Sequence, residues 1–322
     1  MHTRIWRQNL SGDNQNEQDV NATLVWLLGI PQLDEYLSFV RKRVVRGEKI
    51  APRLLVDEWR AANDVFYDLE QNEAGDADKI STRPLNGEVT KLAAELRETE
   101  HFKAMFDTVP VAFEMVELDR LIVCQSEVAD IYSDTIAHAL GSNPSAEALF
   151  RFCMSIDRVL PPVTIKRISA QLYHFVSPAT DLRAHDVALL SPSDLVSVNS
   201  IGPVAAALGL IVGFTPNFLS AIRSDNRLLL HNGYHRAYAL RSMGITHAPC
   251  IVETVTRTNE LSIIANSNVS SDPAFYFRAA RPPMLRDFFN PKLRKLLLVR
   301  PMETIVEVKF SMTDLTSTQI EQ

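Results

Sequence analysis

The sequence predicts an α+β fold in which a helical N-terminal domain precedes a mixed-sheet domain. Up to about residue 107, apolar residues recur at helical spacing, as they do at Leu55, Trp59 and Ala62. After Pro110 the sequence pattern changes to shorter alternating or apolar runs that are bounded by turn residues, which is typical of strands. We therefore divide the chain into a flexible stretch 1–16, a helical domain 17–107 and an α+β domain 108–322.

The N-terminal domain is expected to contain four helices. The second of them begins at Pro31, which suits the first helical position because its ring fixes φ and its missing N–H has no partner to lose there. A polar loop over 73–86 separates the last two. The expected helices cover residues 17–30, 31–45, 53–72 and 87–107.

The second domain mixes strands, helices and a loop rich in Ser, Pro and Asp. Strands are expected at 111–123, 163–176 and 304–310, and helices at 126–141, 145–160 and 259–268. Residues 177–199 are expected to form the loop, and 204–211 a short helix or a buried strand.

Composition narrows the class of protein. A net charge of −6 argues against binding nucleic acid through the whole surface, although a local basic patch remains open. Cys124, Cys153 and Cys250 form no CxxC pair and lie among apolar residues, so we expect buried free thiols in a reducing compartment. The first residues lack the apolar core of a signal peptide, and no apolar run is long enough to cross a bilayer. We expect a cytoplasmic protein without membrane contact.

Residues 217–254 carry the clearest indication of chemistry. Two apolar strands flank the turn residues 224–226, and a helix over 234–243 follows and ends at Gly244. Asn232 suits the cap of this helix, and Gly233 permits a close backbone approach. A backbone turn that leads into a helix N-terminus forms a site for anions.

Two cations occupy the first turn of that helix, where they oppose the helix dipole by roughly 0.3–1 kcal/mol. They are His235, if protonated, and Arg236. A bound phosphate would reverse this cost by joining both side chains and the backbone N–H groups in one anion site. In the alternative interpretation, Arg236 pairs with a carboxylate such as Glu253 and His235 is an ordinary half-buried histidine.

The segment GYHRAYALRSMGI resembles the G-x-x-R-x-x-A-x-x-x-x-G segment of the ParB/sulfiredoxin-like superfamily. The preceding GFTPNFLSAIR, the following HAPCIVETV and the later NELSIIANSNVS are similar in order and spacing to the family's neighbouring elements, so the resemblance covers about residues 208–270. It implies a ParB/sulfiredoxin-like mixed-sheet domain. Residues 115–140 are either its opening strand, in which case the region around 141–205 is an insertion, or an unrelated strand–helix unit.

The resemblance implies a nucleotide site for ATP or CTP, with Mg²⁺ as the accompanying ion. His235 and Arg236 are the candidate catalytic residues, and Asn266 is an alternative to Asn268 as the match to the family's Asn-containing box. The nucleotide-binding residues implied are Gly213, Asn232, Gly233, Tyr234, His235, Arg236 and Asn268.

Departures from the family pattern limit the reaction. Tyr234 stands where sulfiredoxins have a reactive cysteine, so their thiol chemistry is not expected. His235 replaces the second arginine of partition proteins, and Pro282 and Pro283 break the helical pattern where their helix-turn-helix would follow. The His–Arg variant is more similar to members that act on small molecules, including free amino-acid kinases. We expect an NTPase or a small-molecule kinase, with a non-enzymatic DNA-associated or regulatory adaptor as the alternative.

A basic and aromatic segment near the C-terminus is the candidate for nucleic-acid contact, because aromatic rings stack on bases while cations meet phosphates. A solvated basic face over a core contact is the competing interpretation. The histidines show no metal-ligand spacing, and the sequence leaves open whether the chain forms a homodimer. The candidate nucleic-acid residues are Arg278, Arg281, Lys292, Arg294 and Lys295.

Overall fold

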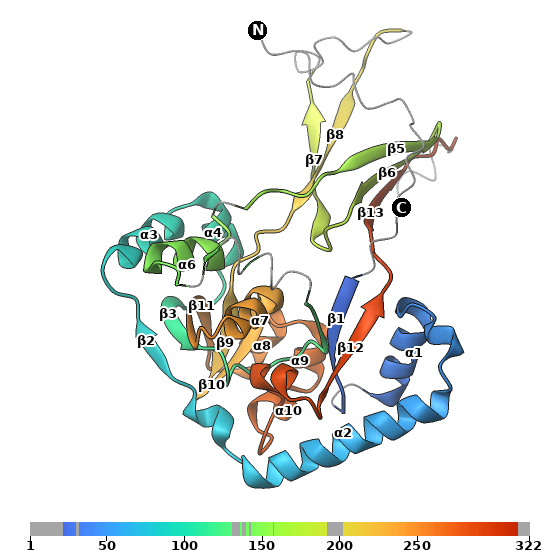
Figure 1. Cartoon of the computed structure of the whole chain (residues 1–322). Helices are drawn as coiled ribbons and strands as arrows, with labels where there is room; N and C mark the ends of the chain where they lie inside the picture. The colour runs from blue at the N-terminus through green and yellow to red at the C-terminus, as the bar shows by residue number, and fades with distance from the viewer. Residues whose placement is uncertain are drawn as a thin grey trace.

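The computed structural model of the chain describes residues 22–29, 32–130, 136, 140–141, 143–156, 158–191 and 202–314, so the stretch 1–16 lies outside the described residues. The structure contains both helices and mixed sheets, as the predicted α+β class requires (Figure 1). The helices are α1 Leu33–Arg43, η1 Gly47–Lys49, α2 Pro52–Asn72, η2 Asp76–Lys79, α3 Glu88–Arg97, α4 Glu100–Met105, α6 Ala146–Cys153, α7 Tyr234–Ser242, α8 Thr258–Ile264, α9 Ser267–Ser271, α10 Pro273–Phe277 and η4 Leu285–Phe289. The strands are β1 Ala22–Leu27, β2 Thr82–Pro84, β3 Val111–Glu117, β4 Glu127–Ala129, β5 Thr164–Ser169, β6 Leu172–Ser177, β7 Leu182–Leu190, β8 Ala207–Phe214, β9 Ser220–Ser224, β10 Arg227–Asn232, β11 His247–Val255, β12 Arg294–Val299 and β13 Thr304–Lys309.

A five-stranded mixed sheet, in the order β10-β9-β11-β3-β2, forms the centre of the molecule. Strand β11 lies in its middle and is buried along most of its length, which explains its nearly continuous apolar sequence. It runs parallel to β9 and antiparallel to β3. The parallel pairing follows from the connection, because the chain leaves β9 through the hairpin partner β10 and helix α7 before it returns as β11.

A second sheet, in the order β12-β1-β4, corrects two of the predicted helices. Residues 22–27 form strand β1, not part of a helix over 17–30, and pair antiparallel with β12 from the other end of the chain. The run ATLVWL suits a buried strand as well as a buried helix, and the distant partner decides between them. Likewise, Glu127–Ala129 pairs with β1 where the sequence predicted the start of a helix.

Two small sheets project from the rest of the molecule (Figure 1). One has the order β13-β6-β5, and the other is the ribbon of β7 and β8. Strand β7 occupies part of the segment predicted as a loop, because Leu182–Leu190 pairs antiparallel with β8, with a register shift between Ala184 and Asp186. Residues 192–199 of that predicted loop lie outside the described residues. The expected strands at 163–176 and 304–310 are confirmed as β5, β6 and β13, and residues 204–211 contribute to strand β8.

One large hydrophobic core joins the helices to the two central sheets. It contains residues from both sides of position 108, among them Trp26 and Tyr36 before it and Leu118 and Ile251 after it. Helix α4 begins anew after α3 because the Thr99 hydroxyl accepts the Phe102 N–H at 3.3 Å, which divides the single helix predicted for 87–107. Among the described residues, no helix has the length and apolar character needed to cross a membrane.

Candidate functional site

The hairpin and helix predicted within residues 217–254 are confirmed as β9, β10 and α7, and strand β11 follows them. Gly233 starts helix α7 with φ +90°, and a Cβ added there would lie 2.7 Å from Leu219 Cδ1, so both the conformation and the space require glycine. Asn232 does not cap the helix as predicted. Its Oδ1 accepts the N–H of Gly233 at 2.7 Å and fixes the turn instead.

A cavity of about 550 Å³ opens at this junction, a size suited to a small-molecule ligand. Its walls come from parts of the chain that are far apart in sequence: β1, α1, the segment that enters β4, the end of β10, the start of α7 and the start of α9. The lining residues are Trp26, Phe39, Arg43, Cys124, Gln125, Ser126, Glu127, His231, Asn232, Tyr234, Asn266, Ser267 and Asn268.

Three polar side-chain atoms in the wall are buried without a hydrogen-bond partner in the part of the chain that the structure describes. They are Trp26 Nε1, Arg43 Nε and Glu127 Oε2. Trp26 is 5% exposed, so its indole N–H has lost water without gaining an acceptor. Leaving a buried polar group unpaired costs about 1–3 kcal/mol, and native proteins keep few such groups. Three in one cavity point to a missing polar partner.

Glu127 has the electrostatic character of a proton acceptor. Its carboxylate is half-buried, and desolvation raises its pKa above the usual range, while the nearby positive charge of Arg43 pulls that pKa back down. A carboxylate with a raised pKa is a stronger base than one in water. The cavity therefore contains a strengthened base beside a cation.

Aromatic rings form the wall next to this charged pair. The Trp26 and Phe39 ring centroids are 4.1 Å apart. The Tyr36 ring also contacts Trp26, with its centroid 6.0 Å from that of Trp26. The Arg43 guanidinium sits 5.6 Å from the centre of the Phe39 ring. This contact orients the guanidinium, because a cation is attracted to the face of an aromatic ring.

The opposite wall is held by hydrogen bonds. The Tyr234 hydroxyl donates to the Leu230 carbonyl at 2.6 Å and accepts the Cys124 N–H at 3.1 Å. Asn266 donates to Cys124 Sγ at 3.2 Å, and its Oδ1 accepts the Val269 N–H as the cap of α9. Burial raises the pKa of Tyr234 well above its usual range, so the phenol stays neutral and serves as a fixed structural contact.

The structure brings some of the predicted nucleotide residues to this cavity. Asn232, Tyr234 and Asn268 line it, as does the alternative Asn266, and Gly233 sits in the turn between Asn232 and Tyr234. His235 does not line the cavity, and its Nδ1 accepts the Ala129 N–H at 3.0 Å. Desolvation of the ring and the neighbouring Arg236 charge lower the pKa of His235, which favours the neutral imidazole.

Arg236 points into the protein and does not line the cavity. Its guanidinium donates to the Cys153 carbonyl at 2.7 Å and to Asn217 Oδ1, and the residue is 7% exposed. Burial is the main cause that lowers its pKa to about 10. Glu253, the carboxylate partner considered for Arg236 from sequence, contacts His231 instead. Arg236 thus anchors α7 to the end of α6.

Gly213 lies apart from these residues, on β8 opposite Arg183, with His185 above it. It does not line the cavity. Strand β8 pairs with β7 in the projecting ribbon and not with the central sheet, so Gly213 lies on a different sheet from the turn at Gly233.

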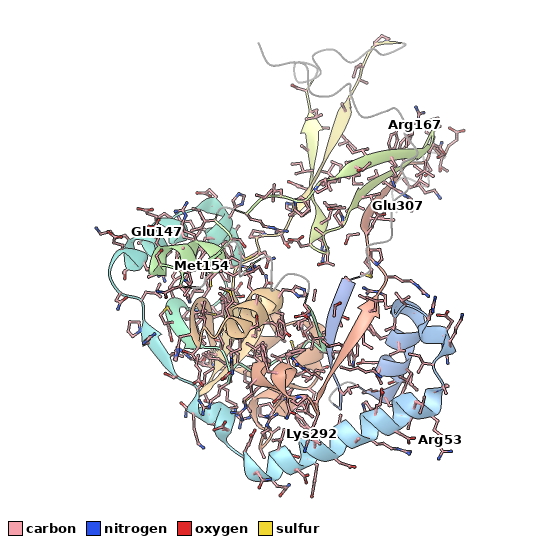
Figure 2. The ribbon with its side chains drawn as sticks, in the orientation of Figure 1. Arg53, Glu147, Met154, Arg167, Lys292 and Glu307 are labelled. Atoms are coloured by element: carbon pink, nitrogen blue, oxygen red, sulfur yellow. The ribbon has the colours of Figure 1, made fainter. Side chains whose placement is uncertain are left out.

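The predicted basic surface is dispersed. Arg281 is 2% exposed and bound to Asp287 at 2.6 Å and to Glu73 at 3.0 Å, which corrects the expectation that it faces a nucleic acid. Lys295 pairs with Glu58, and Arg294 is half-buried on β12. Arg278 and Lys292 remain exposed, and Figure 2 places Lys292 at the end of the molecule opposite the projecting sheets.

Sequence reasoning missed Trp26, Arg43, Glu127 and His231. The tryptophan stood in a segment predicted as helix, and Arg43 is one of three cations in the last turn of α1. Glu127 follows the strand 111–123, and only its pairing with β1 turns it toward the cavity wall. No local pattern marks Trp26, Arg43 or Glu127, because each reaches the site through contacts between distant elements. His231 directly precedes the predicted Asn232–Gly233 turn, and its position beside that turn is the signal that could have identified it.

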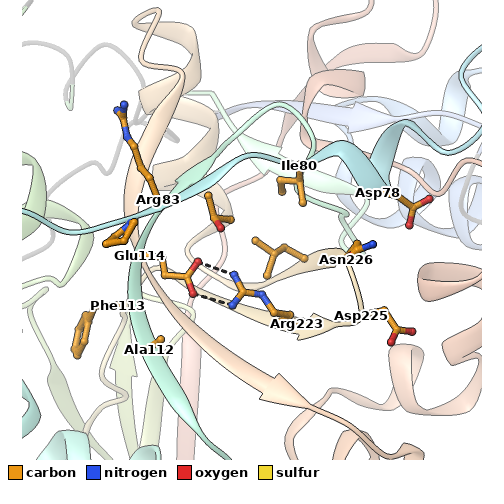
Figure 3. Close-up of a pocket in the computed structure, with 12 residues that line it drawn as sticks. Asp78, Ile80, Arg83, Ala112, Phe113, Glu114, Arg223, Asp225 and Asn226 are labelled. Atoms are coloured by element: carbon orange, nitrogen blue, oxygen red, sulfur yellow. Dashed lines mark hydrogen bonds and ion pairs between the residues drawn. The ribbon is translucent and has the colours of Figure 1, made fainter.

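A larger cavity, about 660 Å³, lies beside the turn of the same hairpin. In its middle, Glu114 and Arg223 face each other and form two hydrogen bonds of 2.6 and 2.8 Å (Figure 3). At its edge, Asp78 binds Arg227 at 2.7 and 3.0 Å. These charges are already satisfied by the protein, so the smaller cavity with its unpaired atoms is the better candidate site.

Within the described ranges, no group of three or more His, Cys, Asp and Glu side chains is arranged to hold a metal ion. In comparisons with known proteins, the chain matches no family model, no curated protein and no solved structure. The likeness to the ParB/sulfiredoxin-like superfamily therefore stays a prediction from the sequence.

Proposed function

We propose that the cavity at the start of α7 binds a nucleoside triphosphate and that the protein catalyses phosphoryl transfer to a small molecule or to water. The observation that carries the proposal is the set of unpartnered atoms in one wall, Trp26 Nε1, Arg43 Nε and Glu127 Oε2. The indole and the guanidinium are donors of the kind that bind phosphate, and the carboxylate is an acceptor. This mixture of donors and an acceptor matches a ligand that carries both an anion and a hydroxyl or bound water.

The position of the cavity supports an anionic ligand. Asn232 and Tyr234 bring the first turn of α7 to its wall, and the N–H groups of a first helical turn have no intrahelical acceptor. The partial positive charge of the helix start adds to the charge of Arg43. The Trp26 and Phe39 rings offer apolar surface for the uncharged part of the ligand.

Glu127 is the proposed base. It would accept the proton of the attacking hydroxyl or water, while Arg43 and the helix start stabilise the charge on the transferred phosphoryl group. Mg²⁺ in such sites is held largely by the phosphates and one or two carboxylates, so it would enter with the nucleotide. The order of hairpin, helix α7 and parallel strand β11 supports the finer proposal of a ParB/sulfiredoxin-like domain.

Calorimetric titration with ATP, CTP and inorganic tripolyphosphate, each with and without Mg²⁺, tests the binding. Arg43→Gln should weaken the binding of the preferred ligand roughly 10- to 100-fold, because it removes a charge-assisted hydrogen bond. Arg41→Gln is the matched control, since it makes the same change at an exposed position of the same helix turn. No binding by the wild type, or equal losses in both variants, would contradict the proposal.

The alternative function, a non-enzymatic adaptor, predicts that the protein binds a nucleotide without turning it over. If the protein binds a nucleotide and releases no product with any acceptor or with water, the cavity serves regulation. The dispersed basic residues give a nucleic-acid role no comparable support, because Arg281 and Lys295 are engaged with carboxylates.

A further inference from the structure

His231 is a further polar group of the cavity wall whose contacts suggest a ligand. It stands at the end of β10, immediately before the Asn232–Gly233 turn, and it lines the cavity. Its Nδ1 lies 3.2 Å from Glu253 Oε2 on the neighbouring part of the central sheet. The side chain of Glu253 is 5% exposed and that of His231 is 28% exposed. One edge of the ring is therefore held inside the protein while the rest reaches the cavity.

The buried carboxylate determines how the ring is used. Glu253 is far from water and needs a donor, because an unpaired buried carboxylate is costly. The Nδ1–H of His231 is that donor, which fixes the ring orientation and the position of its proton. The Nε2 edge lies on the other side of the imidazole and is left to a ligand.

We propose that His231, oriented by Glu253, forms a hydrogen bond through Nε2 with a phosphate group of the ligand. This inference rests on the proposed function, since it names a residue that recognises the phosphate of the same cavity. It replaces His235 in that role, because the Nδ1 of His235 is occupied by the Ala129 N–H. Arg43 and His231 would then hold the phosphate chain from α1 and from β10.

The other ionisable groups of the wall suit this arrangement. Arg43 faces the cavity from α1, Glu127 from β4, and Cys124 and Tyr234 from the wall beside His231. Glu127 is close enough to Arg43 for that charge to influence its pKa. Glu127 thus has the charge of Arg43 nearby, Glu253 has the ring of His231 as its partner, and a phosphate chain between Arg43 and His231 would contact both side chains.

Two substitutions at the same position separate the two edges of the ring. In His231→Asn, the amide can still reach Glu253 from the position of Nδ1, but nothing replaces Nε2. In His231→Gln, the longer amide can reach the position of Nε2. Titration of inorganic tripolyphosphate should give a dissociation constant about 10- to 100-fold higher for His231→Asn than for the wild type. The value for His231→Gln should lie within a few-fold of the wild type.

A measurement on the wild type covers the case in which a variant does not fold. With ¹⁵N-labelled histidine, addition of tripolyphosphate should move the Nε2 resonance of His231 and leave that of the exposed His101 in place. Wild-type binding with an unchanged His231 resonance, or with full affinity in His231→Asn, would overturn the inference and leave the proposed function standing. Absence of wild-type binding to tripolyphosphate, ATP and CTP would remove both.

Discussion

The two ends of the β9–β10 hairpin carry cavities of opposite character. At the turn, Glu114 and Arg223 bind each other through two hydrogen bonds inside the larger cavity. At the other end, where β10 leads into α7, Glu127 and Arg43 each retain an unpaired atom. The larger cavity is the one at the turn. Unmet hydrogen-bonding capacity, and not volume, distinguishes a candidate ligand site from a gap between elements.

The pKa shifts of the two glutamates express the same contrast. Hydrogen bonds from Arg223 lower the pKa of Glu114 below its usual range, so the protein is stabilised by that negative charge. Desolvation raises the pKa of Glu127, so the protein is strained by the same charge there. Strain at one carboxylate and stabilisation at the other is the arrangement expected for a functional and a structural group.

The largest effect should come from Glu127→Gln. Removal of the base should lower turnover roughly 10²- to 10⁴-fold, while the dissociation constant for the nucleotide changes little because the phosphate contacts remain. The free energy of unfolding should stay the same or rise, since a strained buried charge is removed. Single-turnover kinetics and urea unfolding on one preparation measure both. Unchanged turnover would show that Glu127 is not the base.

A smaller effect, on stability, is expected for Arg236→Met. The substitution leaves the Cys153 carbonyl and the Asn217 amide oxygen without their donor, which should cost about 1–3 kcal/mol. Nucleotide affinity should persist in the folded fraction. Arg241→Met is the control, because Arg241 lies on the same helix but is 32% exposed and pairs with Asp119. Full stability with lost nucleotide binding would instead support the phosphate role that the family resemblance implied for Arg236.

The smallest effect should come from Glu114→Gln, and its size depends on pH. Because the folded-state pKa of Glu114 is lowered, its contribution to stability is present above the usual glutamate range and is lost as pH falls through the folded pKa. The variant should be less stable at neutral pH by about 1 kcal/mol and should approach the wild type in acid. For Glu127→Gln we expect the opposite effect at neutral pH, where the variant should be more stable than the wild type. The folded-state pKa of Glu127 is raised, so its negative charge destabilises the protein only at pH values above the usual glutamate range. Unfolding midpoints from neutral to acid pH would separate the two slopes.

The sequence by itself determined the local units of this protein. Apolar periodicity and turn residues were enough to identify helices α1, α2 and α7, the β9–β10 hairpin with its turn at Asp225, and strand β11. It also marked the junction at Gly233, because a tight turn from a strand into a helix needs the positive φ that glycine adopts without steric cost. These features depend on interactions between near neighbours in the chain, which a sequence pattern records directly.

Only the tertiary structure decided which residues face the cavity. Trp26 and Glu127 become strand residues because β1, β4 and β12 pair across almost the whole length of the chain. Arg236 and Arg281 resemble exposed cations in the sequence, yet each is buried against acceptors from distant segments. Whether a charged side chain is buried and paired depends on the partner that the fold brings to it. The residues next to that side chain in the sequence do not indicate which partner this is.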